Sequence, residues 1–232
     1  MWIIGHRGAQ AEEPENTLRS MRKGCECADF VEVDVRLSHD GIPVVIHDAK
    51  LDRTTSGTGR VNDHTLKELR LLDAGEGETI PTLSEILALV KGTCGIFIEI
   101  KEPGSEQAVC SLLEKYPGDD VFIVSFHEES LRVVKNLLSP IKTGYIFSEP
   151  NDNPISKAVR LKADAIIPRL DRLSPDLIDT AHENRILVIP WTPNTSRQIR
   201  RAIKLGADGI ITDDPCMAHR FLNESKGPGT TS

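Results

Sequence analysis

Apolar and charged residues alternate strictly through residues 30–36, which read Phe-Val-Glu-Val-Asp-Val-Arg. This period of two is typical of a β-strand with two unlike faces. The valines face one side of the strand, and Glu32 and Asp34 face the other. The Cβ atoms of these two carboxylates lie about 7 Å apart, so their oxygens can converge on one hard cation. From this strand alone, a solvated charged face that binds nothing is the better explanation.

Short apolar runs alternate with amphipathic segments along the rest of the chain. The patterns predict strands at 2–5, 30–36, 95–101, 121–126, 143–147, 165–168, 186–191 and 209–212. They predict helices at 16–25, 82–91, 105–115, 128–138, 154–162, 175–184, 196–205 and 215–223. Strands of continuous apolar character need cover on both faces. About eight such units predict a (β/α)8 TIM barrel. A doubly wound open sheet is the alternative, but no glycine-rich dinucleotide fingerprint follows the first strand.

The stretch 51–79 interrupts this alternation. It contains a loop rich in Gly, Thr and Ser at 54–59, followed by leucines at helical spacing at 66, 69 and 72. We interpret it as a small cap inserted after the second strand, without a core of its own. Residues 1–224 then form a single barrel domain, and 225–232 form a tail that we expect to be disordered.

Composition excludes several classes of protein. The 232 residues are 39% hydrophobic and 27% charged, with a net charge of −7, which argues against a nucleic-acid partner. No apolar run is long enough to span a membrane, so we expect no stable membrane insertion. The five cysteines are odd in number and scattered, which predicts reduced thiols and a cytoplasmic protein. The composition leaves the oligomeric state open.

Polar residues gather where the predicted strands end, which is where TIM barrels place their chemistry. His6 and Arg7 follow the first strand, and His47 ends the apolar run 42–46, which we read as a further strand. Glu99 and Lys101 repeat the spacing of the two carboxylates on a strand of Ile and Phe. A surface ion pair is the commoner fate of such a pair, but a closed barrel has no edge strand.

A shared cation would satisfy the three carboxylates Glu32, Asp34 and Glu99, since a buried unpaired carboxylate is costly. An all-oxygen site favours one divalent cation, Mg²⁺ or Ca²⁺, over Zn²⁺. His6 and His47 each end a strand, and sequential strands are usually adjacent. Two imidazoles that flank a substrate can act as general acid and base.

A charge count suggests the substrate. Three carboxylates, a divalent cation, Arg7 and Lys101 sum to +1, which suits a monoanion such as a phosphodiester. Arg7 would offer bidentate donors to the phosphoryl oxygens, and Lys101 a point charge. Two other classes stay open: a Schiff-base aldolase that uses Lys101, and a non-catalytic binding barrel.

The chain resembles the glycerophosphodiester phosphodiesterase family from residue 4 to residue 215. The resemblance rests on His6-Arg7-Gly8, Pro14-Glu15-Asn16-Thr17, Glu32-Val33-Asp34-Val35, His47-Asp48, Arg53-Thr54-Thr55, Glu99-Ile100-Lys101, Trp191-Thr192 and residues 206–213.

This resemblance implies a TIM barrel that hydrolyses glycerophosphodiesters to an alcohol and glycerol 3-phosphate. It implies His6 and His47 as the acid–base pair, Glu32, Asp34 and Glu99 as metal ligands, and Arg7 and Lys101 as phosphate ligands. Phe126 and Trp191 would line the glycerol and headgroup side. The alcohol is open, and a lysophospholipase D-like activity on a lipid substrate is an alternative.

Overall fold

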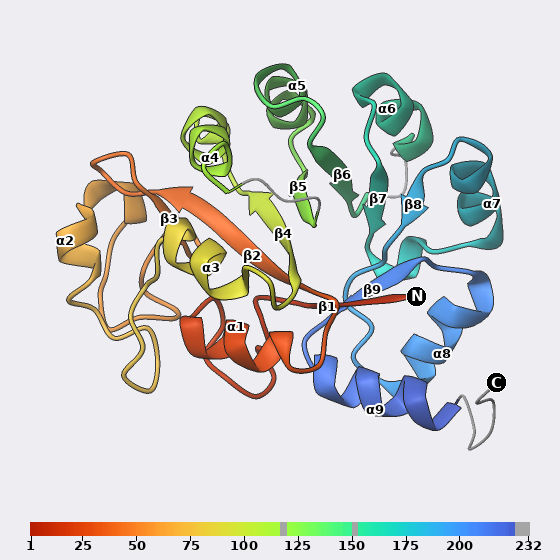
Figure 1. Cartoon of the computed structure of the whole chain (residues 1–232), viewed down its shortest axis with the longest axis horizontal. Coiled ribbons are helices and arrows are strands. Elements are labelled where there is room, and N and C mark those ends of the chain that lie inside the picture. The colour runs from red at the N-terminus through yellow and green to blue at the C-terminus, as the bar shows by residue number, and fades with distance from the viewer. Residues whose placement is uncertain (117–119, 150–152, 226–232) are drawn as a thin grey trace.

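The strands form a ring with helices outside it, as the alternation of elements predicts (Figure 1). This computed structural model describes residues 1–116, 120–149 and 153–225. Within these ranges, eight parallel strands neighbour one another in the order β8-β7-β6-β5-β4-β2-β1-β9. They are β1 (Trp2–Gly5), β2 (Phe30–Leu37), β4 (Gly95–Ile100), β5 (Val121–Ser125), β6 (Lys142–Phe147), β7 (Ala165–Pro168), β8 (Leu187–Val188) and β9 (Gly209–Thr212).

Trp191 connects the two ends of this series of strands. The strand predicted over 186–191 is regular only at β8, but Trp191 forms parallel bridges with Arg169 beyond β7 and with Ile211 of β9. The backbone N–H of Ile211 also donates to the carbonyl of Pro190 over 3.0 Å. The expected (β/α)8 barrel is thereby confirmed.

Helices follow the strands around the outside of the ring (Figure 1). They are α1 (Leu18–Cys25), α3 (Leu83–Val90), α4 (Glu106–Leu113), α5 (Glu128–Leu137), α6 (Pro154–Leu161), α7 (Pro175–Glu183), α8 (Ser196–Leu205) and α9 (Pro215–Ser225). Side-chain caps start several of them: Thr17 accepts from Ser20 at α1, and Thr82 forms a capping box with Glu85 at α3. Helix α9 reaches Ser225, one residue into the expected tail, and the rest of that tail lies outside the described residues. In the described parts of the chain, no helix has the length and apolar character needed to cross a membrane.

The two faces of β2 go to different places. Its valines are buried against helices of the outer layer, in a cluster that includes Met21 of α1 and Leu83 of α3. Phe30 instead belongs to the barrel interior, where it packs edge-on against Phe97 with ring centroids 5.3 Å apart. Phe97 and Phe122 are stacked at 4.5 Å. Aromatic rings therefore fill part of the barrel, and the carboxylates of β2 lie on the same interior face as Phe30.

The further strand expected before His47 does not join the parallel strands of the barrel. It forms a short strand, β3 (Pro43–Val45), which runs antiparallel to β2 with Val35 opposite Val45. A tight turn causes the reversal, because Gly41 adopts a φ of 75° and its N–H bonds to the carbonyl of Ser38. The expectation that the strands of His6 and His47 are neighbours is therefore wrong, since β2 separates β1 from β3.

The insertion contains a 3₁₀ turn, η1 (Val61–Asp63), and one helical turn, α2 (Leu66–Leu69). Its buried residues belong to a small cluster that it shares with the barrel. Leu51, Val61 and Leu69 are buried together with residues from the chain on either side of the insertion, Val44, Ile46 and Ile80. This separate cluster fixes the insertion to the barrel beside β3.

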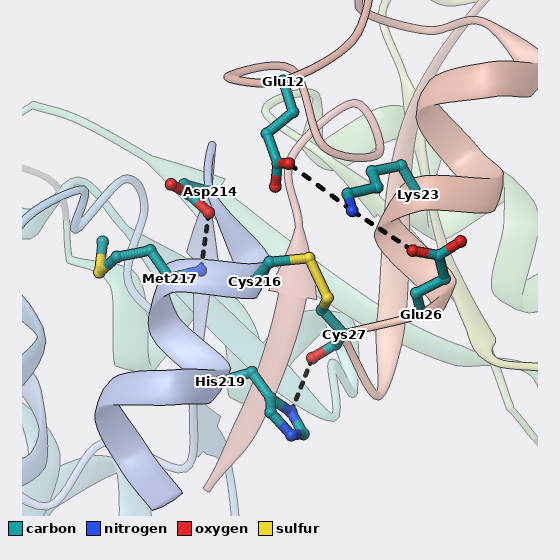
Figure 2. The surroundings of a disulfide bond; sticks show 8 residues. All are labelled: Glu12, Lys23, Glu26, Cys27, Asp214, Cys216, Met217 and His219. Atoms are coloured by element: carbon teal, nitrogen blue, oxygen red, sulfur yellow. Dashed lines mark hydrogen bonds and ion pairs between the residues drawn. A yellow bond between two sulfur atoms is a disulfide. The ribbon is translucent and has the colours of Figure 1, made fainter. Parts of the chain in front are cut away.

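The cysteines correct a second expectation, that of five reduced thiols. Cys25 is bonded to Cys94, and Cys27 to Cys216, with Cα separations of 5.5 and 4.9 Å. Figure 2 shows the second bridge, which joins the chain after α1 to the start of α9. Cys110 alone is free, and burial raises the pKa of its thiol to about 11. The partners are 69 and 189 residues apart in sequence, so only the folded barrel reveals the pairing.

Candidate active site

Strand register brings the three predicted carboxylates together. Asp34 of β2 lies directly opposite Glu99 of β4, and Glu32 precedes Asp34 by two residues on the same face. All three residues are buried, and one oxygen from each lies within 4.8 Å of the others. This convergence is the one that the period-two pattern of the two strands suggested, and it excludes the solvated face.

Cations surround this carboxylate cluster. Lys101 Nζ lies 2.7 Å from Glu99 Oε1 and 3.3 Å from Asp34 Oδ1, and Arg7 Nε lies 3.2 Å from Asp34 Oδ2. Burial favours raising the pKa of Asp34, but Lys101 and Arg7 together hold that pKa below its usual value. Burial and the neighbouring carboxylates raise the pKa of Glu32 well above its usual range. Burial and Asp34 raise the pKa of Glu99 to about 7. Two of the three groups thus lack enough positive charge to ionise freely.

The donor set fits a divalent cation. Glu32 Oε1 and Asp34 Oδ1 are buried and accept no hydrogen bond from any residue that the structure describes. Their other oxygens are held: Glu32 Oε2 accepts from the Arg7 N–H at 2.9 Å, and Asp34 Oδ2 from the Asn16 amide at 2.8 Å. Lys101 Nζ pairs with Asp34 Oδ1 at 3.3 Å, whereas Glu32 Oε1 has no such partner among the described residues. A hard cation with oxygen ligands would satisfy both oxygens and favour the ionised form of Glu32 and Glu99.

Each of the two predicted histidines contacts a carboxylate through Nδ1. His6 Nδ1 lies 2.6 Å from Asp213, just after β9, and His47 Nδ1 lies 2.6 Å from Asp48. The Gln10 amide nitrogen also lies 2.6 Å from His6 Nδ1. At His47, the carboxylate favours the tautomer in which Nδ1 carries the proton and Nε2 is the acceptor. Burial lowers the pKa of His47, although Asp34 works in the opposite direction. The neutral imidazole is therefore favoured at position 47 near pH 7.

Arg7 holds an unusual backbone conformation, with a φ of 51° in the left-handed region. This conformation lets its N–H reach Glu32 while its side chain turns towards Asp34 and Glu15, whose Oε1 is 2.8 Å from Arg7 Nη1. Asn16, which also has a positive φ of 61°, orients Asp34 through both its amide nitrogen and its oxygen. Two residues with left-handed backbone conformations therefore hold the carboxylate cluster in place.

An apolar wall faces these polar groups across a cavity of about 130 Å³. Phe126 and Trp191 contact each other edge-on with ring centroids 5.9 Å apart, and Trp191 Nε1 donates to the carbonyl of Ile167. The lining consists of His6, Arg7, Glu32, His47, Glu99, Lys101, Val124, Phe126, Ile146, Ile167, Trp191 and Ile211. Eight of the nine predicted site residues thus line one cavity, and the ninth, Asp34, is buried against Arg7 and Lys101.

The sequence reasoning gave no role to several residues that hold this site together, namely Glu15, Asn16, Asp48, Arg53 and Asp213. Asp48 and Asp213 directly follow predicted strand ends, which was a usable signal. Glu15, Asn16 and Arg53 lie in loops, where no periodicity marks them, although they belong to motifs on which the family resemblance rests. Their contacts depend on where distant loops meet.

Comparisons with known proteins show the family of this chain. The profile of the "Glycerophosphoryl diester phosphodiesterase family" matches residues 6–217. The "Glycerophosphodiester phosphodiesterase" of Caldanaerobacter subterraneus subsp. tengcongensis is 38% identical over 92% of this chain and 94% of its own length. The protein of the same name from Bacillus altitudinis is 33% identical over 97% of this chain and 99% of its own.

Solved structures have the same architecture. An Oleispira antarctica phosphodiesterase in complex with the product sn-glycerol-3-phosphate has a TM-score of 0.91 and 28% identity, covering 96% of this chain and 97% of that one. A glycerophosphodiester phosphodiesterase from Thermotoga maritima has a TM-score of 0.83 and 29% identity, covering 96% and 97%. From its sequence, its barrel and these relatives, the chain belongs to the glycerophosphoryl diester phosphodiesterase family and is a phosphoric diester hydrolase.

Proposed function

We propose that this enzyme hydrolyses glycerophosphodiesters to an alcohol and glycerol 3-phosphate with the help of one divalent cation. The observation that carries the proposal is the convergence of Glu32, Asp34 and Glu99 beside two carboxylate-held histidines. Glu32 Oε1 and Asp34 Oδ1, which accept no hydrogen bond from the described residues, supply hard ligands together with the nearby Glu99, which favours Mg²⁺ or Ca²⁺. When bound, the cation would supply positive charge that polarises the phosphoryl group and stabilises a developing alkoxide.

Arg7 and Lys101 would bind the phosphodiester. Both line the cavity, and neighbouring carboxylates raise the pKa of each above its ordinary value despite burial. They therefore carry a full positive charge at neutral pH. The sum of +1 for the ligands, the cation and these two side chains matches a monoanionic substrate.

The histidines would move the protons. The contacts of their Nδ1 atoms with Asp213 and Asp48 leave Nε2 of His6 and His47 for the cavity that both residues line. One imidazole would take the proton of the attacking hydroxyl, from water or from the substrate's own glycerol, and the other would protonate the leaving alcohol. If the glycerol hydroxyl attacks, the product is a cyclic phosphodiester, which water would then open to glycerol 3-phosphate with the two imidazoles in exchanged roles. Phe126 and Trp191 would pack against the carbon skeleton of the glycerol, and the related Oleispira antarctica enzyme binds sn-glycerol-3-phosphate.

Lys101 argues against the aldolase alternative. A Schiff-base lysine must lose its proton, which requires a depressed pKa. Burial acts in that direction, but Asp34 and Glu99 outweigh it and raise the pKa of Lys101. Its ammonium is therefore a charged ligand and a poor nucleophile.

The cysteine pairs bear on the compartment. The expectation of a cytoplasmic protein rested partly on reduced thiols, and disulfides are rare in the cytosol of most organisms. We propose that the thiol state of the protein in the source cell reveals its compartment. Alkylation of thiols at lysis followed by mass spectrometry tests this: five alkylated cysteines support the cytoplasm, and one supports an oxidising compartment.

The experiment that tests the function measures release of glycerol 3-phosphate from glycerophosphocholine and glycerophosphoethanolamine with Mg²⁺, Ca²⁺ or EDTA. Turnover that EDTA abolishes supports both the reaction and the cation. Release of choline from lysophosphatidylcholine under the same conditions tests the lysophospholipase D alternative, because that activity leaves the acyl chain on the glycerol phosphate and frees no glycerol 3-phosphate. Turnover that persists unchanged in EDTA contradicts the metal-dependent mechanism.

A further inference from the structure

Arg53, which lies in the insertion, contacts two carboxylates of the site: Asp48, which bonds to His47, and Glu15, which bonds to Arg7. We propose that Arg53 is a positioning residue that orients His47 through Asp48 and Arg7 through Glu15. Its Nε donates to Asp48 Oδ2 at 2.6 Å, and its two terminal nitrogens donate to the two oxygens of Glu15 at 2.8 Å each. One planar guanidinium therefore fixes two carboxylates at once, a geometry that a lysine cannot reproduce. The inference rests on the proposed function, because both orientations serve the proposed phosphodiester chemistry.

The contact with Asp48 acts on His47. Asp48 uses Oδ1 for the His47 Nδ1 contact at 2.6 Å, and Arg53 holds Oδ2 and approaches Oδ1 at 3.2 Å. Arg53 thus contacts both oxygens of the carboxylate that holds the imidazole. Without Arg53, Asp48 can rotate, and nothing else in the described contacts of Asp48 would keep its oxygen on Nδ1.

The contact with Glu15 acts on Arg7. Glu15 Oε1 accepts from both Arg53 and Arg7, so its charge is shared between two guanidinium groups. Arg53 also holds Oε2, which keeps the carboxylate turned towards Arg7. Loss of Arg53 would leave Glu15 to neutralise Arg7 alone and would weaken the attraction of Arg7 for an anion.

The location of Arg53 separates this role from a structural one. Its side chain is 47% exposed, whereas Glu15 is 16% exposed. It lines, together with Glu15, an outer cavity of about 490 Å³ and is not among the residues that line the cavity of the site. Exposed ion pairs add little to stability, so removal should lower the melting temperature by no more than about 3 °C.

The test compares Arg53→Ala with Arg60→Ala, a second exposed arginine of the insertion whose side chain bonds only to Asn62 among the described contacts. With Mg²⁺ and glycerophosphocholine, we expect Arg53→Ala to lower kcat about 10–100-fold and to raise KM, as for other groups that orient ligands. Added guanidinium should restore part of kcat, because the vacated position is open to solvent. Arg60→Ala should resemble the wild type with and without guanidinium.

A second readout does not depend on turnover. Long-range proton–nitrogen NMR of the His47 ring should show a protonated Nδ1 in the wild type and in Arg60→Ala, and a mixture of tautomers in Arg53→Ala. An unchanged His47 tautomer and a kcat within about 3-fold of wild type would overturn the positioning role. A wild type inactive on every phosphodiester would instead overturn the proposed function, and the NMR spectra would still decide whether Arg53 orients His47.

Discussion

The buried carboxylate of Glu99 should make the metal-free protein less stable as the pH rises. Its pKa is raised from an ordinary 4.5 to about 7 by burial and by Asp34. Between those two values the folded chain holds a proton that the unfolded chain has lost, so the free energy of unfolding falls as pH increases. A shift of this size corresponds to about 3 kcal/mol of stabilisation, which is fully present below pH 4.5 and is lost as the pH rises through 7.

Glu99→Gln removes this charge while keeping the shape of the side chain. In EDTA, we expect the variant and the wild type to be nearly equally stable at pH 4.5, where Glu99 is protonated. At pH 8 we expect the variant to be more stable by about 3 kcal/mol. Lys101 stays paired with Asp34 at 3.3 Å, so the substitution leaves no unpaired ammonium.

The assay is urea unfolding at both pH values, with and without Mg²⁺. Mg²⁺ should stabilise the wild type by mass action and have much less effect on the variant, which has lost a ligand. Glu85→Gln is the control, because the pKa of Glu85 is lowered. Burial acts to raise this pKa, but the hydrogen bonds from Arg70 and from Thr82 at the helix cap outweigh burial. That control should lose stability relative to the wild type as the pH rises, the opposite sign.

One result would refute this reasoning. If Glu99→Gln is less stable than the wild type in EDTA at pH 8, or if the difference between them is the same at both pH values, Glu99 carries no unfavourable charge in the metal-free fold. The carboxylate cluster would then be a self-sufficient ion-pair network with Lys101 and Arg7, and the argument for a cation from unsatisfied charge would fail.

Three further predictions follow from the site and the cysteines. His6→Ala and His47→Ala should each lower kcat about 10²–10⁴-fold while calorimetry shows Mg²⁺ binding retained, and activity surviving both changes would exclude their acid–base roles. Asn16→Gly, which keeps the positive φ but removes both bonds to Asp34, should weaken Mg²⁺ binding about 10–100-fold by titration calorimetry. Thiol titration of the denatured protein should find one reactive thiol before reduction and five after it, and five before reduction would contradict both bridges.

The sequence predicts the barrel and the carboxylate cluster well because both depend on local patterns. Period-two alternation in β2 and β4 places Asp34 and Glu99 on the interior face, and parallel pairing then sets them opposite each other. Strand ends bring His6 and Lys101 to the same face of the barrel. For these residues, knowing the strand and its register is nearly equivalent to knowing the site.

Chain reversals and long-range pairs limit the prediction. His47 reaches the cavity from an antiparallel hairpin that depends on the turn at Gly41, so the expected reason for its location was wrong although the location was right. The cysteine pairs join positions that only barrel closure brings together. Their odd number pointed to free thiols, yet it also fits two bridges and one buried thiol.

The orienting residues show why a list of the predicted metal ligands is an incomplete account of this site. Glu32 and Asp34 can be found from a strand pattern. Asn16, which bonds to Asp34, and Arg53, which bonds to Glu15, act instead from loops of irregular backbone. Such residues satisfy hydrogen bonds that exist only after folding, so no periodicity marks them. The chemistry of the enzyme is therefore encoded at two levels: strands fix which groups meet, and the loops, including the insertion, fix how those groups are oriented.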